Sequence, residues 1–240
     1  MNPGIVIQAR LASTRLPGKS LLPARGLPLI GWVLRRLAFA RLPIILAVPE
    51  KELPEFLFLK EKTWMNAGGV LHSPEPRFEI FGGEEQDVLG RYVSAARAFD
   101  VDPIVRVTGD NPLTSVEGLL FVLEKFLLQP PDLAHPVGLP HGSGVEIISR
   151  RSLELANLEA LLPYEREHVT PYFYRSPGRF RILPVPVPAP LVCPDFRTTV
   201  DTMEDLKRFE RIAKEVPPRG GYIRLADAIS FFEVSRRNGG

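Results

Sequence analysis

Hydrophobic runs of strand length alternate with helical patterns through the first half of the chain. Three runs are rich in β-branched residues, as in buried parallel strands: residues 5–7, 44–48, and 104–107, the last of which Arg106 interrupts. Stretches with apolar positions at helical spacing lie beside them, at residues 28–41, 52–66, 88–99 and 114–128. The alternation predicts an α/β fold with a mostly parallel sheet, helices on both faces, and a ligand crevice beyond the carboxyl ends of the strands.

The second half of the chain is less regular. Strands are predicted at residues 133–135, 145–148, 179–187 and 198–200, and helices at 152–161, 203–214 and 225–232. The repeated prolines of residues 179–187 indicate an edge strand. A Thr-x-x-Glu capping box at Thr114 and Glu117 predicts the start of the helix over 114–128. Since no linker or repeat interrupts the pattern, we expect one domain over residues 1–240.

Composition narrows the class of protein. The 240 residues carry 30 Lys and Arg against 28 Asp and Glu, so the chain lacks the strong basicity of a typical nucleic-acid binder. No apolar stretch approaches the roughly 20 residues that span a bilayer. The single cysteine, Cys193, and the lack of an export signal predict a cytoplasmic protein without disulfides.

The charge is uneven, because no carboxylate precedes Glu50 while the first loop holds Arg10, Arg15 and Lys19. This loop follows the strand at 5–7, at the strand end where backbone N–H groups and cations can bind a multiply charged anion. Gly18 lets the backbone turn closely beside a ligand. The pattern favours a phosphate-binding loop over a solvated basic face, although it matches neither the Walker A pattern nor Gly-x-Gly-x-x-Gly.

Two carboxylates follow predicted strands, Asp110 in RVTGDNPL and Asp201 in TTVDT. At neighbouring strand ends, facing the cationic loop, they would form a Mg²⁺ site, since Mg²⁺ takes one or two carboxylates together with phosphate oxygens. Taken singly, each has an ordinary alternative, an Asx turn for Asp110 and a helix cap for Asp201. The Asp-x-Asp of Asp100 and Asp102 precedes its strand and is expected at the opposite edge of the sheet.

Five segments together resemble the cytidylyltransferase-like proteins of spore-coat polysaccharide biosynthesis, relatives of the CMP-Kdo and CMP-sialic acid synthetases. They are IVIQARLASTRLPGKSLLPARGLPLIGWVL, DVLGRY, RVTGDNPL, YEREHVTPYFYR and TVDTMEDL. The resemblance covers roughly residues 4–215. It implies a three-layer α/β/α, Rossmann-like nucleotide-diphosphosugar transferase fold with a mixed sheet, and a Mg²⁺-dependent transfer of CMP from CTP to a sugar or sugar acid in a homodimer.

The resemblance also assigns residues. Catalytic roles fall to Arg10, Lys19, Asp110 and Asp201, the last two of which hold Mg²⁺. Nucleotide binding falls to Gln8, Ala9, Arg10, Ser13, Arg15, Lys19, Asp87 and Arg91. Contacts with the acceptor sugar are implied for Glu146, Arg166 and His168, although aromatic packing or a dimer contact equally explains the segment around His168. Positions 12, 82 and 144 depart from the family pattern, as Ala12, Gly82 and Gly144.

Two other functions stay open at this point. The fold also suits a glycosyltransferase that uses an NDP-sugar, and a nucleotide-binding protein without turnover. Pyrophosphate release from CTP in the presence of a sugar would indicate the transferase of CMP. Sugar transfer without pyrophosphate release would indicate the glycosyltransferase. Nucleotide binding with neither pyrophosphate release nor sugar transfer would indicate the protein without turnover.

Overall fold

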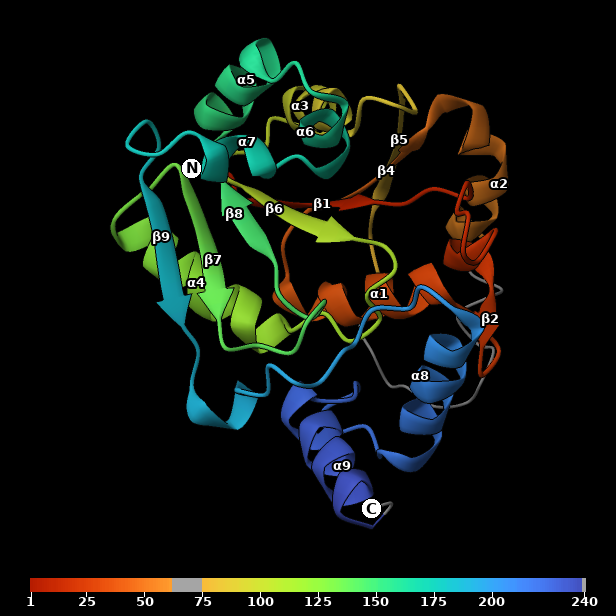
Figure 1. The fold of residues 1–240 in the computed structure, drawn as a ribbon. Coiled ribbons are helices and arrows are strands. Elements are labelled where there is room, and N and C mark those ends of the chain that lie inside the picture. Colours follow the sequence, from red (N-terminus) through yellow and green to blue (C-terminus); the bar gives the residue numbers. More distant parts are fainter. Residues whose placement is uncertain (62–74, 239–240) are drawn as a thin grey trace.

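The computed structural model describes residues 1–61 and 75–238, in which a mixed sheet lies between two layers of helices (Figure 1). The strands are β1 (Gly4–Gln8), β2 (Pro23–Ala24), β3 (Leu27–Pro28), β4 (Ile44–Pro49), β5 (Glu79–Gly83), β6 (Ile104–Thr108), β7 (Leu133–Val137), β8 (Glu146–Ile148) and β9 (Ile182–Pro186). The helices are α1 (Leu29–Leu37), α2 (Leu53–Leu57), α3 (Val88–Ala98), α4 (Val116–Leu128), α5 (Arg150–Glu159), α6 (Pro163–His168), α7 (Pro171–Arg175), α8 (Met203–Glu215) and α9 (Leu225–Asn238).

The main sheet has the order β5-β4-β1-β6-β8-β7-β9. Of these strands β8 alone runs against the others, because it pairs antiparallel with both β6 and β7. The four strands from β5 to β6 are parallel, so the ends of β1 and β6 lie side by side, with Gln8 in register with Thr108. The predicted mostly parallel, mixed sheet is confirmed, and β9 is an edge strand as expected.

The strands are apolar on both faces because helices cover both faces. In β1, Ile5 and Ile7 pack into the core formed with α1, α4, α8 and α9, and Val6 packs into the core formed with α3, α5 and α7. All three side chains are fully buried. Figure 1 shows the second group of helices above the sheet and the first group below it. The three-layer α/β/α prediction is confirmed. No described helix is both long enough and apolar enough to cross a membrane.

Two local predictions were wrong. Ser115, and not Thr114, caps α4, because its hydroxyl accepts from Gly118 N–H at 2.9 Å while the Thr114 hydroxyl donates to Asn111 O. Residues 198–200 form no strand, but their backbone follows the sheet edge, with Val200 N–H donating to Asp110 O at 3.0 Å.

The helix expected over 52–66 is helical through Lys60 in the part that the structure describes, as α2 followed by the 3-10 turn Phe58–Lys60. Its end, with the expected stop at Gly68, lies outside the described residues.

The Asp-x-Asp motif lies at the amino-terminal edge of the sheet, as predicted. The backbone of Asp102 pairs with that of Asn2, next to the start of β1. The carboxylates of Asp100 and Asp102 accept hydrogen bonds from the side chain and the backbone N–H of Arg150, at 2.7 and 3.0 Å. The motif is therefore across the sheet from the carboxyl ends of β1 and β6.

Candidate active site

The loop after β1 is held in one shape by its own backbone and by one carboxylate. Gly18 has a φ of +69°, which suits glycine, and its N–H donates to Leu11 O at 2.9 Å. The Ser20 hydroxyl donates to Arg10 O at 3.0 Å. Glu52, buried just after β4, accepts from Leu11 N–H at 2.7 Å. These three contacts direct the polar side chains of the loop towards the carboxyl ends of β1 and β6.

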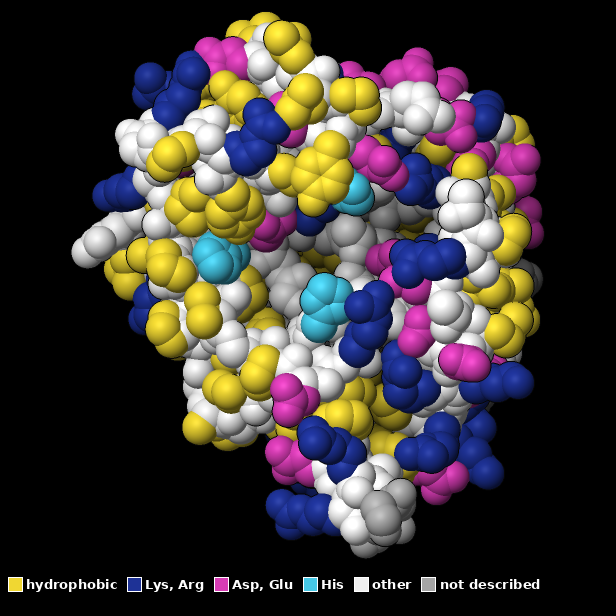
Figure 2. Space-filling model, in the orientation of Figure 1, with side chains coloured by type: hydrophobic (Ala, Val, Ile, Leu, Met, Phe, Trp, Pro, Cys, Tyr) yellow, Lys and Arg dark blue, Asp and Glu magenta, His cyan; other side chains and the backbone are white. Residues whose placement is uncertain are grey.

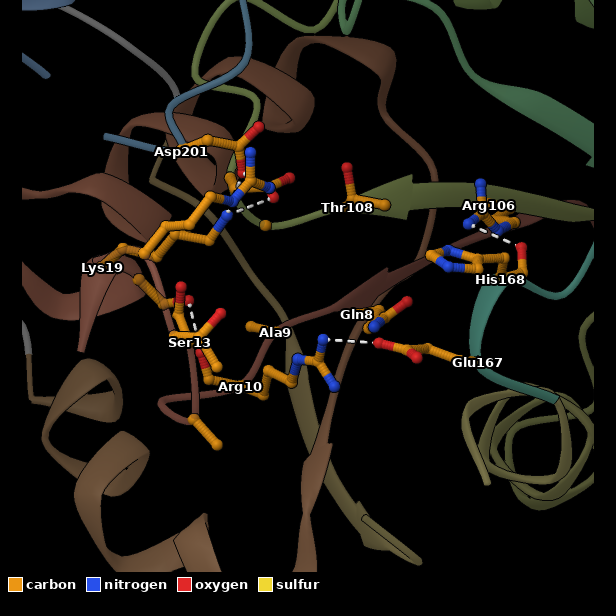
Figure 3. A pocket seen from close by; sticks show the side chains of 16 residues that line it. Gln8, Ala9, Arg10, Ser13, Lys19, Arg106, Thr108, Glu167, His168 and Asp201 are labelled. Carbon is orange, nitrogen blue, oxygen red and sulfur yellow. Dashed lines mark hydrogen bonds and ion pairs between the residues drawn. The ribbon is translucent and has the colours of Figure 1, made fainter. Parts of the chain in front are cut away.

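Lys19 brings together the two carboxylates predicted to bind metal. Its ammonium nitrogen lies 2.7 Å from Asp110 Oδ2 and 2.9 Å from Asp201 Oδ1, and it also donates to Val200 O at 3.2 Å (Figure 3). The Lys19 side chain is 12% exposed. This contact joins three segments that are distant in sequence. It holds them firmly, because charge-assisted hydrogen bonds are strong where water is excluded.

Asp201 is surrounded by cations. Besides Lys19, Arg15 lies 3.0 Å from its Oδ1 and Arg197 lies 2.7 Å from its Oδ2. Burial by itself would raise the pKa of Asp201, but the hydrogen bonds and charges of Lys19, Arg197 and Arg15 outweigh burial, so the pKa lies below its ordinary value. Three cations therefore face the carboxylates of Asp110 and Asp201, and the local charge is positive.

Arg10 points to the other side of the crevice, towards α6. Its guanidinium contacts Glu167 Oε1 at 2.7 Å, across 157 residues of sequence (Figure 3). Both side chains are partly exposed, at 36% and 42%. The pair spans the crevice, so an anion that binds Arg10 must compete with Glu167.

A cavity of about 350 Å³ lies between the loop, the end of β6 and α6. Nine of the residues predicted from the sequence line it: Gln8, Ala9, Arg10, Ser13, Arg15, Lys19, Asp110, His168 and Asp201. Arg106 and Thr108 of β6 line it as well. The crevice beyond the carboxyl ends of the strands thus has the cationic loop and both carboxylates on its walls, as the alternation of strands and helices predicted.

A second cavity of about 550 Å³ opens beside the first, and Arg106, Thr108 and His168 border both. Glu146 and Gly144 line this second cavity. Arg106 Nη1 lies 2.8 Å from Glu146 Oε2, and Tyr174 OH donates to the other oxygen of Glu146 at 3.0 Å. The two cavities therefore adjoin each other at β6.

Three predicted residues lie outside the walls of both cavities. Asp87 caps α3 by accepting from Gly90 N–H at 2.9 Å, and its carboxylate also pairs with Arg166. Arg166 donates to Asn157 O at 2.7 Å. Arg91 is 1% exposed and donates to Glu84 O at 2.6 Å. In this structure the three side chains support α3 and its neighbours, and roles for them in binding stay predictions.

Several site residues were missed by the sequence analysis. Arg106 and Thr108 of β6 alternate with the same period of two that leads to Asp110, just after the strand. This spacing could have identified them as residues on the same side as Asp110. Glu52, Glu167 and Arg197 offered no such signal, because each reaches the site through a contact that depends on the packing of separate elements or on an irregular segment.

The geometry is that of a nucleotide-binding α/β enzyme, with a cationic loop and paired carboxylates at the carboxyl edge of the sheet. Comparison with known proteins identifies the class more closely. The model of the cytidylyltransferase family matches residues 5–53 and 75–233. The chain belongs to this family and is a nucleotidyltransferase.

The relatives confirm the resemblance found in the sequence. The chain is 30% identical over 221 residues to the spore coat polysaccharide biosynthesis protein SpsF of Bacillus subtilis. The aligned region covers 89% of this chain and 87% of that protein. It is 37% identical over 135 residues to the 3-deoxy-manno-octulosonate cytidylyltransferase of Chlorobium chlorochromatii, covering 55% of this chain and 49% of that protein. A solved cytidylyltransferase from Leptospira borgpetersenii has a TM-score of 0.79 at 28% identity, covering 100% of this chain and 95% of that one.

The cations around Asp201 predict a pH dependence of stability. Since the folded-state pKa of Asp201 is below its ordinary value, its charge stabilises the fold above about pH 4, and this stabilisation is lost as the pH falls through the folded-state pKa. Asp201→Asn should lower the free energy of unfolding at pH 7, and its difference from wild type should shrink between pH 5 and 3. Urea unfolding across this range measures it. The exposed Asp195→Asn is the control, with small differences throughout. If the difference in free energy of unfolding between wild type and Asp201→Asn grew as the pH fell, the lowered folded-state pKa of Asp201 would be contradicted.

Proposed function

We propose that this protein transfers CMP from CTP to a hydroxyl group of a sugar or sugar acid and releases pyrophosphate, with Mg²⁺ as cofactor, for the synthesis of surface polysaccharide precursors. The acceptor hydroxyl attacks the α-phosphorus in line, the new P–O bond forms, and the bond to the β-phosphate oxygen breaks. Membership in the cytidylyltransferase family supports the reaction class. The similarity to a spore coat polysaccharide protein supports the use of the product.

The observation that carries the proposal is the contact of Lys19 with Asp110 and Asp201 inside the first cavity. Lys19 and Arg15 carry positive charge at the place where a triphosphate would lie, and Arg10 approaches the same cavity from the loop. These cations would bind the pyrophosphate portion and stabilise the charge that develops as it leaves. Positioning and electrostatics then account for most of the rate, as expected for phosphoryl transfer.

The donor set fits Mg²⁺. Two carboxylate oxygens, one each from Asp110 and Asp201, lie within 3 Å of one cationic nitrogen, so they converge on a single point. Among the described residues no cluster of three or more His, Cys, Asp or Glu side chains could hold an ion, which suits a metal that takes its other ligands from phosphates and water. When bound, Mg²⁺ would offset charge on the phosphate oxygens. Lys19 would then have to release the carboxylates and pair with phosphate.

A nucleotide panel tests the proposed function. CTP, UTP, GTP and ATP with Mg²⁺ are compared by thermal shift, where a ligand at 100 times its dissociation constant stabilises by roughly 2.7 kcal/mol. CTP should give the largest shift, and CTP with sugars and sugar acids should release pyrophosphate. Equal shifts for all four nucleotides would contradict the choice of cytidine. Transfer of a sugar from an NDP-sugar without pyrophosphate would indicate a glycosyltransferase.

The two edges of the sheet offer matched carboxylates for mutation. Asp110→Asn or Asp201→Asn keeps the shape but removes an anionic metal ligand, so kcat should fall about 100-fold or more while CTP binding weakens less. Asp100→Asn and Asp102→Asn, at the amino-terminal edge, should leave kcat within about twofold. Steady-state pyrophosphate release measures all four. The strand-end assignment is wrong if the second pair abolishes turnover and the first pair does not.

Metal binding can be tested without turnover. A metal ion and the Lys19 ammonium would use the same carboxylate oxygens, so Lys19→Met should tighten Mn²⁺ binding to the nucleotide-free protein about tenfold. That change corresponds to about 1.4 kcal/mol. Electron paramagnetic resonance of Mn²⁺, which stands in for Mg²⁺, measures the dissociation constant. Lys51→Met, whose lysine pairs with Glu85 on the surface, should bind Mn²⁺ as wild type does. Unchanged binding in Lys19→Met would show that the metal site lies elsewhere.

A further inference from the structure

Glu167 lines the first cavity, but its carboxylate has no part in the proposed reaction. It comes from α6 and reaches the cavity from the side opposite to the contact of Lys19 with Asp201 (Figure 3). Figure 2 shows the hollow on this face of the molecule, with acidic and basic side chains mixed along one side of it. The first cavity thus contains a carboxylate whose use the metal site and the phosphate loop leave open.

The charges of the lining are paired with one another. Arg10 contacts Glu167 at 2.7 Å, and among the described residues this is its one contact with a carboxylate. Arg106, at the border of the cavity, contacts Glu146 instead. The charged residues of the lining are Arg10, Arg15, Lys19, Arg106, Asp110, Glu167 and Asp201, beside the imidazole of His168. Arg10 therefore depends on Glu167 for its counter-ion.

Glu167 differs from the two aspartates in what can take the place of its cation. In the proposed Mg²⁺ site, Asp110 and Asp201 would bind the metal, which leaves Lys19 for phosphate. Glu167 does not join them, because no cluster of three or more such side chains in the described part of the chain could hold an ion. Metal binding therefore leaves the pair of Arg10 and Glu167 intact, and a phosphate group reaches the Arg10 nitrogen only by displacing the carboxylate.

A ligand can reach both members of this pair. The side chain of Arg10 is 36% exposed and that of Glu167 is 42% exposed, whereas that of Lys19 is 12% exposed. The contact joins Arg10 Nη2 to Glu167 Oε1 at the cavity wall. Because partly exposed ion pairs are weak, a ligand with several negative charges can displace Glu167.

Arg10 also lies in the field of a second cation. Burial lowers the pKa of the Arg91 guanidinium, and the charge of Arg10 lowers it further, while Glu52 and Asp87 act in the opposite direction. Arg91 is 1% exposed, so water screens its charge poorly. Glu167 therefore balances a cation that would otherwise face a like charge, and a bound phosphate would balance it in the same way.

We infer that Glu167 is a positioning residue that acts through Arg10: it holds the guanidinium in the empty site and competes with the phosphate groups that bind there. The inference rests on the proposed function, which places the pyrophosphate portion of CTP against Arg10. Competition weakens the binding of pyrophosphate. After transfer of CMP, the return of Glu167 to Arg10 assists the release of pyrophosphate.

Inorganic pyrophosphate tests this inference without CTP or turnover. Isothermal titration calorimetry is done with EDTA, in about 0.15 M salt and at about pH 8, where free imidazole is neutral. Glu167→Gln keeps the size of the side chain and removes its charge, so it should bind pyrophosphate about fourfold more tightly or better, as expected from loss of one partly exposed ion pair. Glu154→Gln removes a surface carboxylate that lies 2.7 Å from Arg97, and should bind as wild type does.

A smaller gain in Glu167→Gln overturns the inference. Weaker binding overturns it as well, because it would show that Glu167 orients Arg10 for the phosphate. Thermal unfolding confirms that the variants are folded.

A second arm asks whether Glu167 acts through Arg10. In an Arg10→Met background, Glu167→Gln should change the affinity for pyrophosphate less than about twofold, because no guanidinium is left to release and salt screens the remaining repulsion. A larger gain without Arg10 would show that Glu167 repels pyrophosphate directly, and it overturns the inference. If Arg10→Met binds no pyrophosphate up to about 20 mM, the comparison of Glu167→Gln with wild type and Glu154→Gln decides.

The two proposals fail separately. A gain in Glu167→Gln that depends on Arg10, in a protein that releases no pyrophosphate from CTP, would contradict the proposed function alone. Release of pyrophosphate from CTP by a protein in which Glu167→Gln gains no affinity would contradict the role of Glu167 alone.

Discussion

The contact of Lys19 with Asp110 and Asp201 is the interaction around which the active site is organised. It joins the loop after β1, which carries Lys19, to the end of β6 and to the segment before α8. Asp110 and Asp201 lie 91 and 182 residues from Lys19 in the sequence. An unpaired charge in such a place would be costly, so the three groups hold one another in position. The same contact brings one oxygen of each carboxylate within 3 Å of a single nitrogen, which is the convergence that the proposed Mg²⁺ site requires.

The rest of the fold supports this contact from outside. Glu52 holds the loop by its backbone, and the backbone of Val200 donates to Asp110 O, so residues 198–200 follow the sheet without being a strand. Beneath them, the two hydrophobic cores fix β1 and β6 side by side. The site is therefore built at the ends of packed strands, and its charged side chains lie on the segments that follow those strands.

The two cavities differ in their use of charge. In the first, Arg15 and Lys19 face the carboxylates of Asp110 and Asp201, and Arg197 pairs with Asp201 from outside the lining, which suits a ligand that brings several negative charges. In the second, Arg106 and Glu146 cancel, and unpaired hydrogen-bonding atoms remain. Arg106 lies at the boundary, because it lines both cavities.

The amino-acid sequence by itself determined the class of fold and the principal groups of the first cavity. The apolar runs at 5–7 and 44–48, and the run at 104–107 that Arg106 interrupts, indicate parallel strands because such strands are buried on both faces, and this places Arg10, Arg15, Lys19 and Asp110 at one edge of the sheet. These are local signals, since strand period and loop position depend on neighbouring residues. The sequence analysis erred where local signals compete, as at Thr114 and Ser115, which are both good caps.

Only the tertiary structure decided which side chains meet across long separations. It paired Arg10 with Glu167 and Arg106 with Glu146, and it turned Asp87 and Arg166 towards each other outside the cavities. No periodicity encodes such partners, because they depend on how helices of both layers pack against the sheet. The same packing left Asn111 Oδ1 and Thr199 Oγ1 buried without a hydrogen-bond partner among the described residues.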